Sequence, residues 1–347
     1  MRKRAALSAC IALLCALSLA GCGKSAANLF TPKTSAASTS ATAPAGAAPT
    51  SCETSPGLIS ACVRLGDFAT LDPCSLIGVG ALPADLAASP ADRNSLDDCE
   101  FSITAGTERD VVLEIGDLAS GSSDGLYSGG EQQLGPGGLD LEEGTLSQGE
   151  CDDALDFAGD QIKLKIAVFA LSGNGSQALC DAANEVGKAL GDVMNSKTQF
   201  QHFTVPGKTI ATMKACALVG DAHIGNYQLS DETEHPSGHS CEWTPDPGSA
   251  QVELGIDLAI GTKLDAQTAD SHSRIDGIQT YTLKAPLSDY ARCEVDTYRA
   301  PWGNPGAGLF ELPSVWVIEP PGQIETACSL ATQLATVVWP KLPPISS

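Results

Sequence analysis

The sequence is poor in positive charge, in aromatic side chains and in long apolar runs. Each shortage limits the functions or structures that the chain can have. Lysine and arginine total 20 against 42 aspartates and glutamates, so the 347 residues carry a formal net charge of −22. Nucleic-acid binding needs clustered cations that displace counterions, so we exclude a nucleic-acid partner. Aromatic residues make up 5% of the chain, which limits the size of the core. Beyond residue 19 no apolar run approaches the length of a membrane span.

The N-terminus has the pattern of a lipoprotein signal peptide. Residues 2–4 are all basic, and the apolar run Leu7–Leu19 ends on the residues Leu-Ala-Gly-Cys, with the cysteine at Cys22. Small residues before a cysteine resemble a bacterial lipobox, in which the cysteine is lipidated on sulfur and becomes the new N-terminus. The sequence therefore predicts a signal peptide over 1–21, a lipid on Cys22 and attachment to the extracytoplasmic face of the cell membrane. The alternative is an ordinary secretory signal followed by a chance cysteine.

The next segment, residues 22–51, is predicted to be a flexible tether. It is rich in alanine, serine, threonine and proline and has too little apolar bulk to fold. Removal of 1–21 takes away three positive charges, which changes the net charge to −25, together with two of the 13 cysteines. With Cys22 lipidated, ten cysteines remain outside the cytosol. An even number in an oxidising compartment favours five disulfides.

The rest of the chain is predicted to be an internal duplication. The spacing Cys74–Cys99–Cys151 is repeated by Cys216–Cys241–Cys293 at a constant offset of 142 residues. Sequences next to the cysteines also agree, since Cys-Glu-Phe at residue 99 corresponds to Cys-Glu-Trp at residue 241. We therefore expect two related domains, residues 52–200 and 204–347, joined by a connection short enough for the domains to touch.

Each domain is expected to be α+β. Alternating apolar residues over 111–115, 162–168 and 252–258 are typical of half-buried antiparallel strands. Apolar residues at helical spacing predict a C-terminal helix near 179–193 and another near 327–337. Asp72-Pro73 followed by residues 74–86 predicts an N-terminal helix. The fold class is thus two tandem related domains, each an antiparallel sheet packed by N- and C-terminal helices and crosslinked by disulfides.

Four cysteines in each domain allow three pairings. Because the first and fourth cysteines lie near helix starts and the second and third near strand starts, we favour helix-to-helix and strand-to-strand bonds. Cys52 and Cys62 remain to close a small loop. The predicted disulfides are Cys52–Cys62, Cys74–Cys180, Cys99–Cys151, Cys216–Cys328 and Cys241–Cys293.

These features together resemble the actinobacterial "DPC" lipoproteins, a family of unknown function found in mycobacteria and their relatives. The resemblance rests on the lipobox, on Asp72-Pro73-Cys74 and on the two Cys-Glu-aromatic triplets, and it covers residues 72–343 as two copies. The second copy has Lys214-Ala215-Cys216 in place of Asp-Pro-Cys. The resemblance implies an exported, lipid-anchored and disulfide-bonded protein and implies no reaction.

Several motifs associated with catalysis or ligand binding occur in the sequence, but without the structural context that each requires. A structural role is favoured for each of them. Residues 121–125 fit the GxSxG pattern of a hydrolase but lie in a Gly/Ser-rich loop. Gly173-Asn174-Gly175 precedes a predicted helix without a parallel βαβ unit, so a helix start is favoured over a dinucleotide loop. The carboxylates of residues 152–156 could bind calcium, but a solvated face is favoured. We expect no catalytic site, cofactor or metal.

His235 and His239 are the side chains that come closest to a metal site. They lie beside several acidic residues, but Pro236 and Gly238 separate them, so a helical pair of ligands is not expected and a solvated acidic loop is favoured. Trp302 is the candidate partner-binding residue, because it lies on a Pro/Gly loop in the second domain. Packing of Trp302 against its own domain is the favoured alternative.

Two functional hypotheses follow. The first is a non-catalytic cell-envelope lipoprotein that acts as an extracytoplasmic binding or accessory module for an envelope protein or polymer. The alternative is a carrier or chaperone of an apolar, lipid-like ligand, which requires a cavity between sheet and helix.

Overall fold

A computed structural model describes residues 59–344, apart from gaps at 79–81, 84–85, 87, 90–94, 121–126, 128, 136–137, 158–159, 172–174, 197–198, 206–208, 221–222, 230–231, 245–251, 264–268, 289 and 304–307. The predicted signal peptide, Cys22, the tether and Cys52 therefore lie outside the described residues. The same holds for the GxSxG string and for Gly173 and Asn174.

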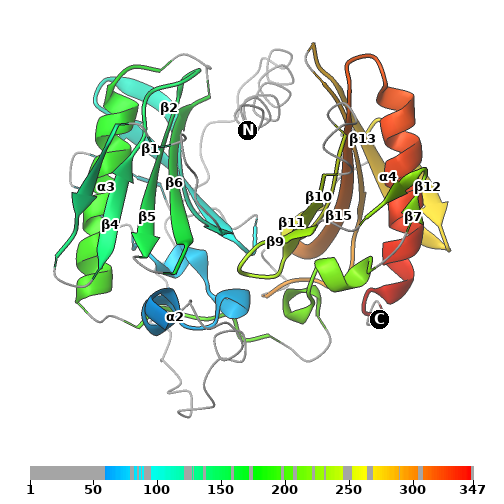
Figure 1. Cartoon of the computed structure of the whole chain (residues 1–347), viewed down its shortest axis with the longest axis horizontal. Coiled ribbons are helices and arrows are strands. Elements are labelled where there is room, and N and C mark those ends of the chain that lie inside the picture. The colour runs from blue at the N-terminus through cyan, green and yellow to red at the C-terminus, as the bar shows by residue number, and fades with distance from the viewer. Residues whose placement is uncertain are drawn as a thin grey trace, which may run out of the picture.

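The described chain forms two α+β units, each with one antiparallel sheet and one long helix across one face of that sheet (Figure 1). In the first unit the short helix α2 (Ile59–Leu65) precedes a six-stranded sheet, and α3 (Ala178–Asn195) follows it. Its strands are β1 (Asp98–Ala105), β2 (Glu108–Ser120), β3 (Gly130–Gln133), β4 (Leu139–Glu143), β5 (Glu150–Phe157) and β6 (Ile162–Ala170).

The second unit has a seven-stranded sheet, a small hairpin and the helix α4 (Ile324–Val338). The hairpin is β7 (His223–Ile224) with β8 (Tyr227–Gln228). The strands of the sheet are β9 (Glu232–Glu234), β10 (Ser240–Trp243), β11 (Glu253–Thr262), β12 (Ser271–Ile275), β13 (Ile278–Pro286), β14 (Ala291–Thr297) and β15 (Leu309–Glu319).

The two sheets have the same strand order. The first runs β1-β2-β6-β5-β4-β3, and the second runs β10-β11-β15-β14-β13-β12 with β9 added beside β10. The registers correspond as well, since Cys99 lies opposite Ile115 in the first sheet and Cys241 lies opposite Ile256 in the second. The two units thus share one strand order and one register at the equivalent cysteines.

Alternation along the strands separates the two faces of each sheet. Alternate residues of β1 and of the middle of β2, including Phe101 and Leu113, are buried in the core that also contains the apolar side of α3. Trp243 takes the corresponding buried position in the second unit and is 1% exposed. The face of each sheet away from its helix, which we call the inner face, is turned toward the middle of the molecule (Figure 1). The predicted strands and both C-terminal helices are therefore confirmed.

The predicted N-terminal helix over residues 74–86 is wrong. The chain instead makes a single 3-10 turn, Pro73–Ser75, in which the Asp72 carboxylate accepts a hydrogen bond from the Cys74 amide at 3.1 Å. Gly78, Gly80 and Pro83 follow within ten residues of the turn, and each of them disfavours continuation of a helix. The corresponding segment of the second unit is likewise a 3-10 turn, Cys216–Leu218.

The predicted pairing of the cysteines within the units is also wrong. The entry turn packs against the first strand of the sheet, whereas the long helix crosses β5 or β14, so each helix cysteine meets a strand cysteine with a Cα–Cα distance near 5 Å. Cys62 is disulfide-bonded, and its predicted bond to Cys52 stays a prediction. The observed bonds are Cys74–Cys99, Cys151–Cys180, Cys216–Cys241 and Cys293–Cys328.

The units contact each other through the segments that lead into their sheets and through the connection between them. The connection pairs with the first unit, since the Phe203 amide donates to the Thr70 carbonyl at 2.6 Å and Leu71 pairs with His202. Among the described residues, no helix has both the length and the apolar character needed to cross a membrane.

Candidate functional site: the junction between the two units

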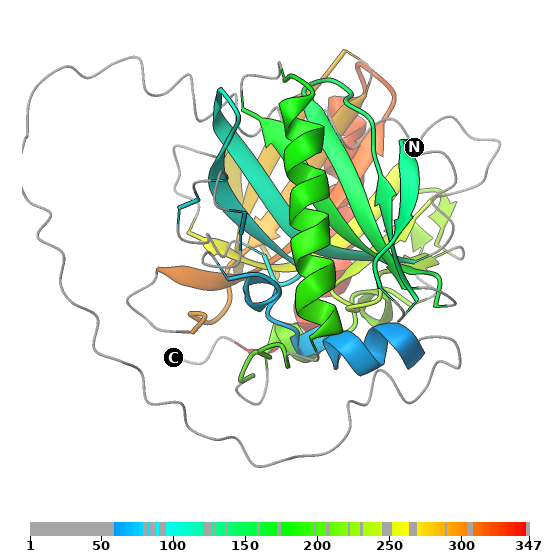
Figure 2. The ribbon, with the colours of Figure 1, turned by 90° about the vertical axis from the view of Figure 1, so that its left-hand side faces the viewer.

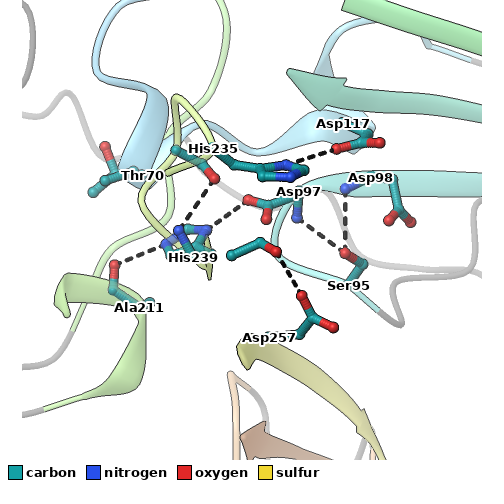
Figure 3. A network of polar contacts seen from close by, with 12 residues as sticks. Thr70, Ser95, Asp97, Asp98, Asp117, Ala211, His235, His239 and Asp257 are labelled. Carbon is teal, nitrogen blue, oxygen red and sulfur yellow. Dashed lines mark hydrogen bonds and ion pairs between the residues drawn. The ribbon is translucent and has the colours of Figure 1, made fainter. Parts of the chain in front are cut away.

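The junction is built from two matching turns, one before β1 and one before β10. In the first, Ser95 Oγ accepts the amide of Asp97 at 3.0 Å, and in the second, Ser237 Oγ accepts the amide of His239 at 3.2 Å. The serine hydroxyl satisfies a backbone donor that the turn leaves without a partner. Both turns thus aim the residue just before the strand at the other unit (Figure 3).

Each turn is held against the second strand of its sheet in the same way. The Asp117 amide donates to the Asp97 carbonyl at 2.7 Å, and the Leu258 amide donates to the His239 carbonyl at 2.8 Å. In the first unit this close approach requires Gly116, because a Cβ there would lie 2.1 Å from the Asp97 carbonyl oxygen. Asp117 follows at φ 46° in a bulge of β2, which directs its side chain into the junction.

His239 makes the central contact. Its Nδ1 lies 2.6 Å from Asp97 Oδ1 and its Nε2 lies 3.1 Å from the Ala211 carbonyl oxygen, while the side chain is only 1% exposed. Both partners accept hydrogen bonds, so both ring nitrogens carry hydrogen and the ring is an imidazolium. Burial alone would lower the pKa of His239, but the Asp97 carboxylate outweighs it and raises the pKa.

His235 makes a second bridge between the units. Its Nδ1 lies 3.4 Å from Asp117 Oδ1, and its Nε2 lies 3.8 Å from Glu242 Oε1. Burial of the ring is again outweighed, here by the carboxylates of Asp117 and Glu242, which raise the pKa of His235 to about 10. The His235 ring is therefore charged at neutral pH.

An apolar cluster completes the junction. Leu96 of the first unit packs with Ala211, Ile260 and Trp302 of the second, and Phe203 of the connection makes an edge contact with the Trp302 ring at 5.4 Å. A gap of about 10 Å³, about the space of one water molecule, is left between Ser237 of the second unit and residues of the first unit that include Leu96. The described contacts of the junction thus join the two units.

These positions correct two interpretations of the sequence. Trp302 is 9% exposed and packs inside the junction, so it is not a surface anchor for a partner. His235 and His239 do not lie on a solvated loop, because His239 is buried and the His235 side chain is only 12% exposed, and each lies against a carboxylate of the other unit. Among the described residues, the trio placed closely enough to hold a metal is Cys216, Glu232 and Cys241, and its two cysteines are bonded to each other.

The His239–Asp97 pair has the composition of a catalytic histidine and its orienting carboxylate, but not the geometry. General acid–base catalysis needs one ring nitrogen available to substrate, and here a carboxylate and a carbonyl occupy both nitrogens. The pair therefore acts as a structural contact. Sequence reasoning missed Asp97 and Asp117, although Asp97 and His239 are separated by 142 residues, the offset that relates the cysteines.

The inner face of the first sheet leads away from the junction and is acidic. Its Lys165 lies 3.4 Å from Asp152 Oδ1 and 3.9 Å from Glu150 Oε1. Burial, and then the neighbouring Asp152, raises the pKa of Glu150 to about 7. Burial and the neighbouring Glu114 raise the pKa of Asp98 well above its usual range. The carboxylates on this face thus outnumber the cations that balance them.

The inner face of the second sheet is acidic as well, and several of its groups are bonded to one another. Asp257 accepts from Ser240 Oγ at 2.6 Å and from Trp316 Nε1 at 2.8 Å. Arg292 lies over the Trp316 ring at 4.8 Å and donates to Glu294 at 2.9 Å. Gly255 leaves room for that ring, since a Cβ there would lie 2.2 Å from it.

Comparison with known proteins gives no identity to this arrangement. No protein-family model, no curated protein and no solved structure matches the chain.

Proposed function

We propose that this protein is a non-catalytic cell-envelope lipoprotein that acts as an extracytoplasmic binding module. The observation that carries the proposal is the junction, in which two imidazolium rings and an apolar cluster fix two units side by side with both inner faces toward the middle. Such an arrangement suits a protein that presents a constant surface to a partner. The four disulfides suit an extracytoplasmic location.

The lipid anchor at Cys22 and the cell-membrane location belong to this proposal on sequence grounds. The lipobox and the resemblance to the "DPC" lipoproteins support them, as do the 29 residues between Cys22 and Cys52, the first cysteine of the predicted disulfides. A flexible segment of that length reaches roughly 30 Å, enough to hold the two units clear of the bilayer surface.

We also propose that the two units are duplicated copies of one domain. Equal strand order, equal register and equivalent turns at Ser95 and Ser237 support a common origin. Contact between equivalent positions, here Asp97 and His239, is the mark of an interface with two-fold symmetry. The junction then derives from the contact of a symmetric dimer whose two halves became one chain.

The partner surface that we propose is the inner face of the two sheets, with a protein or polymer that carries positive charge as its occupant. The acidic groups around Lys165 and Glu294 favour such a partner through charge complementarity. The alternative function, a carrier of an apolar ligand, requires an apolar cavity, and these polar faces do not support it.

A site-specific photo-crosslinking experiment in the native host tests the proposed surface. A photo-reactive residue at Ser102, which is exposed on the inner-face side of β1, is expected to give a discrete high-mass adduct whose formation falls with added salt. The same residue at Asp192, exposed on α3 on the outer side, is the control and is expected to give none. Equal adducts from both sites, or none from Ser102, contradict the proposed surface.

The anchor is tested separately. Wild-type protein is expected to incorporate labelled palmitate and to fractionate with membranes, whereas Cys22→Ser protein does neither. A native mass spectrum of the same Cys22→Ser protein addresses the carrier alternative, because a co-purified lipid would appear as added mass.

A further inference from the structure

A hollow of about 330 Å³ lies on the outer side of the first unit, between α3 and the strands β4 and β5. Figure 2 looks directly onto α3, which forms one wall of this region. The volume falls at the lower end of the range for small-molecule sites, about 300–1,000 Å³. The lining residues are mostly polar: Glu143, Gly144, Asp153, Gln177, Cys180, Asp181, Asn184, Glu185 and Lys188.

Asp153 is the unusual member of this lining. It lies on the helix-facing side of β5, is 1% exposed, and accepts one hydrogen bond at Oδ1 from the Gly144 amide at 2.8 Å. Its other oxygen, Oδ2, is buried and has no hydrogen-bond partner among the described residues. A buried carboxylate oxygen without a partner is costly, so a group that would satisfy it belongs at this place.

The corresponding place in the second unit has no such group. At the offset of 142 residues, Asp153 matches Val295, which is 1% exposed in the core beneath α4. An apolar side chain is therefore the ordinary occupant of this position in the fold. The carboxylate is a feature of the first unit alone, and the shared fold does not require it.

The charge of the hollow defines the class of its ligand. Four carboxylates, on Glu143, Asp153, Asp181 and Glu185, stand against the single ammonium of Lys188. Burial, together with the neighbouring Glu143, raises the pKa of Asp153 to about 6 even though the Gly144 amide lowers it. A cation in the hollow would stabilise all four ionised groups.

The spacing of the carboxylates argues against a bare metal ion. Calcium holds its oxygen ligands at roughly 2.3–2.6 Å, so the ligands lie within about 5 Å of one another. Among the described residues, the only trio of ligand atoms within 4.8 Å of one another is that of Cys216, Glu232 and Cys241, which is remote from this hollow. The carboxylates come from three separate elements and surround a space that is larger than one ion.

A guanidinium group is also a poorer match. Its donors form a planar fork that pairs best with one carboxylate or with parallel acceptors. An ammonium group donates in three directions and suits acceptors that come from different elements. We propose that this hollow binds an alkyl cation with two or more ammonium groups, with one of them bonded to Asp153 Oδ2. Such groups occur in free polyamines and in lysine-rich segments.

Titration calorimetry on the intact protein in non-ionic detergent, at neutral pH and low salt, tests the proposal with spermidine and with a trilysine peptide as probes. At least one probe is expected to bind with one-to-one stoichiometry, and Asp153→Asn is expected to weaken that binding at least tenfold. Asp152→Asn is the matched control, because Asp152 is the preceding residue on the same strand and faces the opposite side of the sheet. It is expected to change the affinity less than twofold.

Further variants keep the test independent of folding. Lys188→Met removes the cation that competes within the hollow and is expected to tighten binding, a gain that a misfolded protein cannot give. Binding of spermidine alone identifies a free polyamine as the source, and binding of trilysine alone identifies a lysine-rich segment. The proposal is overturned if neither probe binds, or if Asp152→Asn weakens binding as much as Asp153→Asn.

Discussion

Residues with the same side chain can have opposite roles, and the five histidines illustrate this. His223 and His272 are exposed, whereas His239 is buried, His235 is largely buried, and each lies against a carboxylate of the other unit. The local sequence around residues 231–239 contains acidic residues, proline and glycine, which favour a solvated loop. The partners that bury the two rings, Asp97 and Asp117, lie more than 100 residues away. No local pattern could therefore have predicted the charge state of these rings.

The pH dependence of stability follows from His235. Its pKa in the folded protein, about 10, exceeds the unfolded value near 6.5. The contribution of this histidine is therefore fully present below about pH 6.5 and is lost as the pH rises toward 10. The free energy of unfolding of the wild type is expected to fall between pH 7 and pH 10, and His235→Gln is expected to flatten that fall.

Urea unfolding at a series of pH values measures this difference. Glu150, whose pKa is raised to about 7 by burial, also makes the protein less stable as the pH rises, but its effect is largely complete near pH 7. The comparison between wild type and variant above pH 8 therefore isolates the histidine. Parallel curves for the two proteins in that range would show that His235 is not charged in the folded state.

Helices and strands with a regular spacing of apolar residues could be predicted from the sequence. Features that depend on how these elements pack together could not. The alternation in β6 and the helical spacing in α3 each indicate one buried face, and both elements form where they were expected. The disulfide pairing depends instead on which strand the helix crosses, because Cys180 of α3 bonds to Cys151 of β5. That choice is made by the arrangement of the whole sheet, which the cysteine spacing alone does not contain.

The pairing of β11 with β15 contains a position where only glycine fits. A Cβ on Gly255 would lie 2.2 Å from the Trp316 ring, which is rigid and is held by Asp257 and Arg292. Gly255→Ala is therefore expected to displace the ring and to lower the free energy of unfolding by about 1–3 kcal/mol. Gly78→Ala is the control, because nothing lies within 4 Å of the added carbon, and it is expected to change stability by less than about 0.5 kcal/mol.

Two measurements separate this explanation from a general loss of glycine flexibility. Tryptophan fluorescence of the Gly255→Ala protein is expected to shift, since the indole of Trp316 loses its hydrogen bond to Asp257. The Gly78→Ala spectrum is expected to match the wild type. A Gly255→Ala protein with wild-type fluorescence and stability would show that the ring does not lie over β11.

At the scale of the whole molecule, the two units differ in charge at positions that are otherwise equivalent. The turns at Ser95–Asp97 and Ser237–His239 have the same hydrogen bonds, and each is tied to the second strand of its own sheet. The junction therefore depends on a carboxylate in one turn and an imidazolium in the other. If the two turns are equivalent, the stability of the protein should depend little on which turn carries the carboxylate and which carries the imidazolium.

Exchange of the two residues tests this equivalence. His239→Asp alone places two carboxylates together, and Asp97→His alone places two imidazole rings together, so each is expected to cost about 2–4 kcal/mol of unfolding free energy. The double variant restores one carboxylate and one imidazole. Its loss of unfolding free energy is expected to be smaller than the summed losses of the two single variants by at least about 1 kcal/mol.

The same exchange at His235 and Asp117 is the control. Those residues are not separated by the repeat offset, and Asp117 occupies a bulge with positive φ, so no recovery is expected there. Recovery at both pairs, or at neither, would show that equivalence of the two turns does not determine the contact.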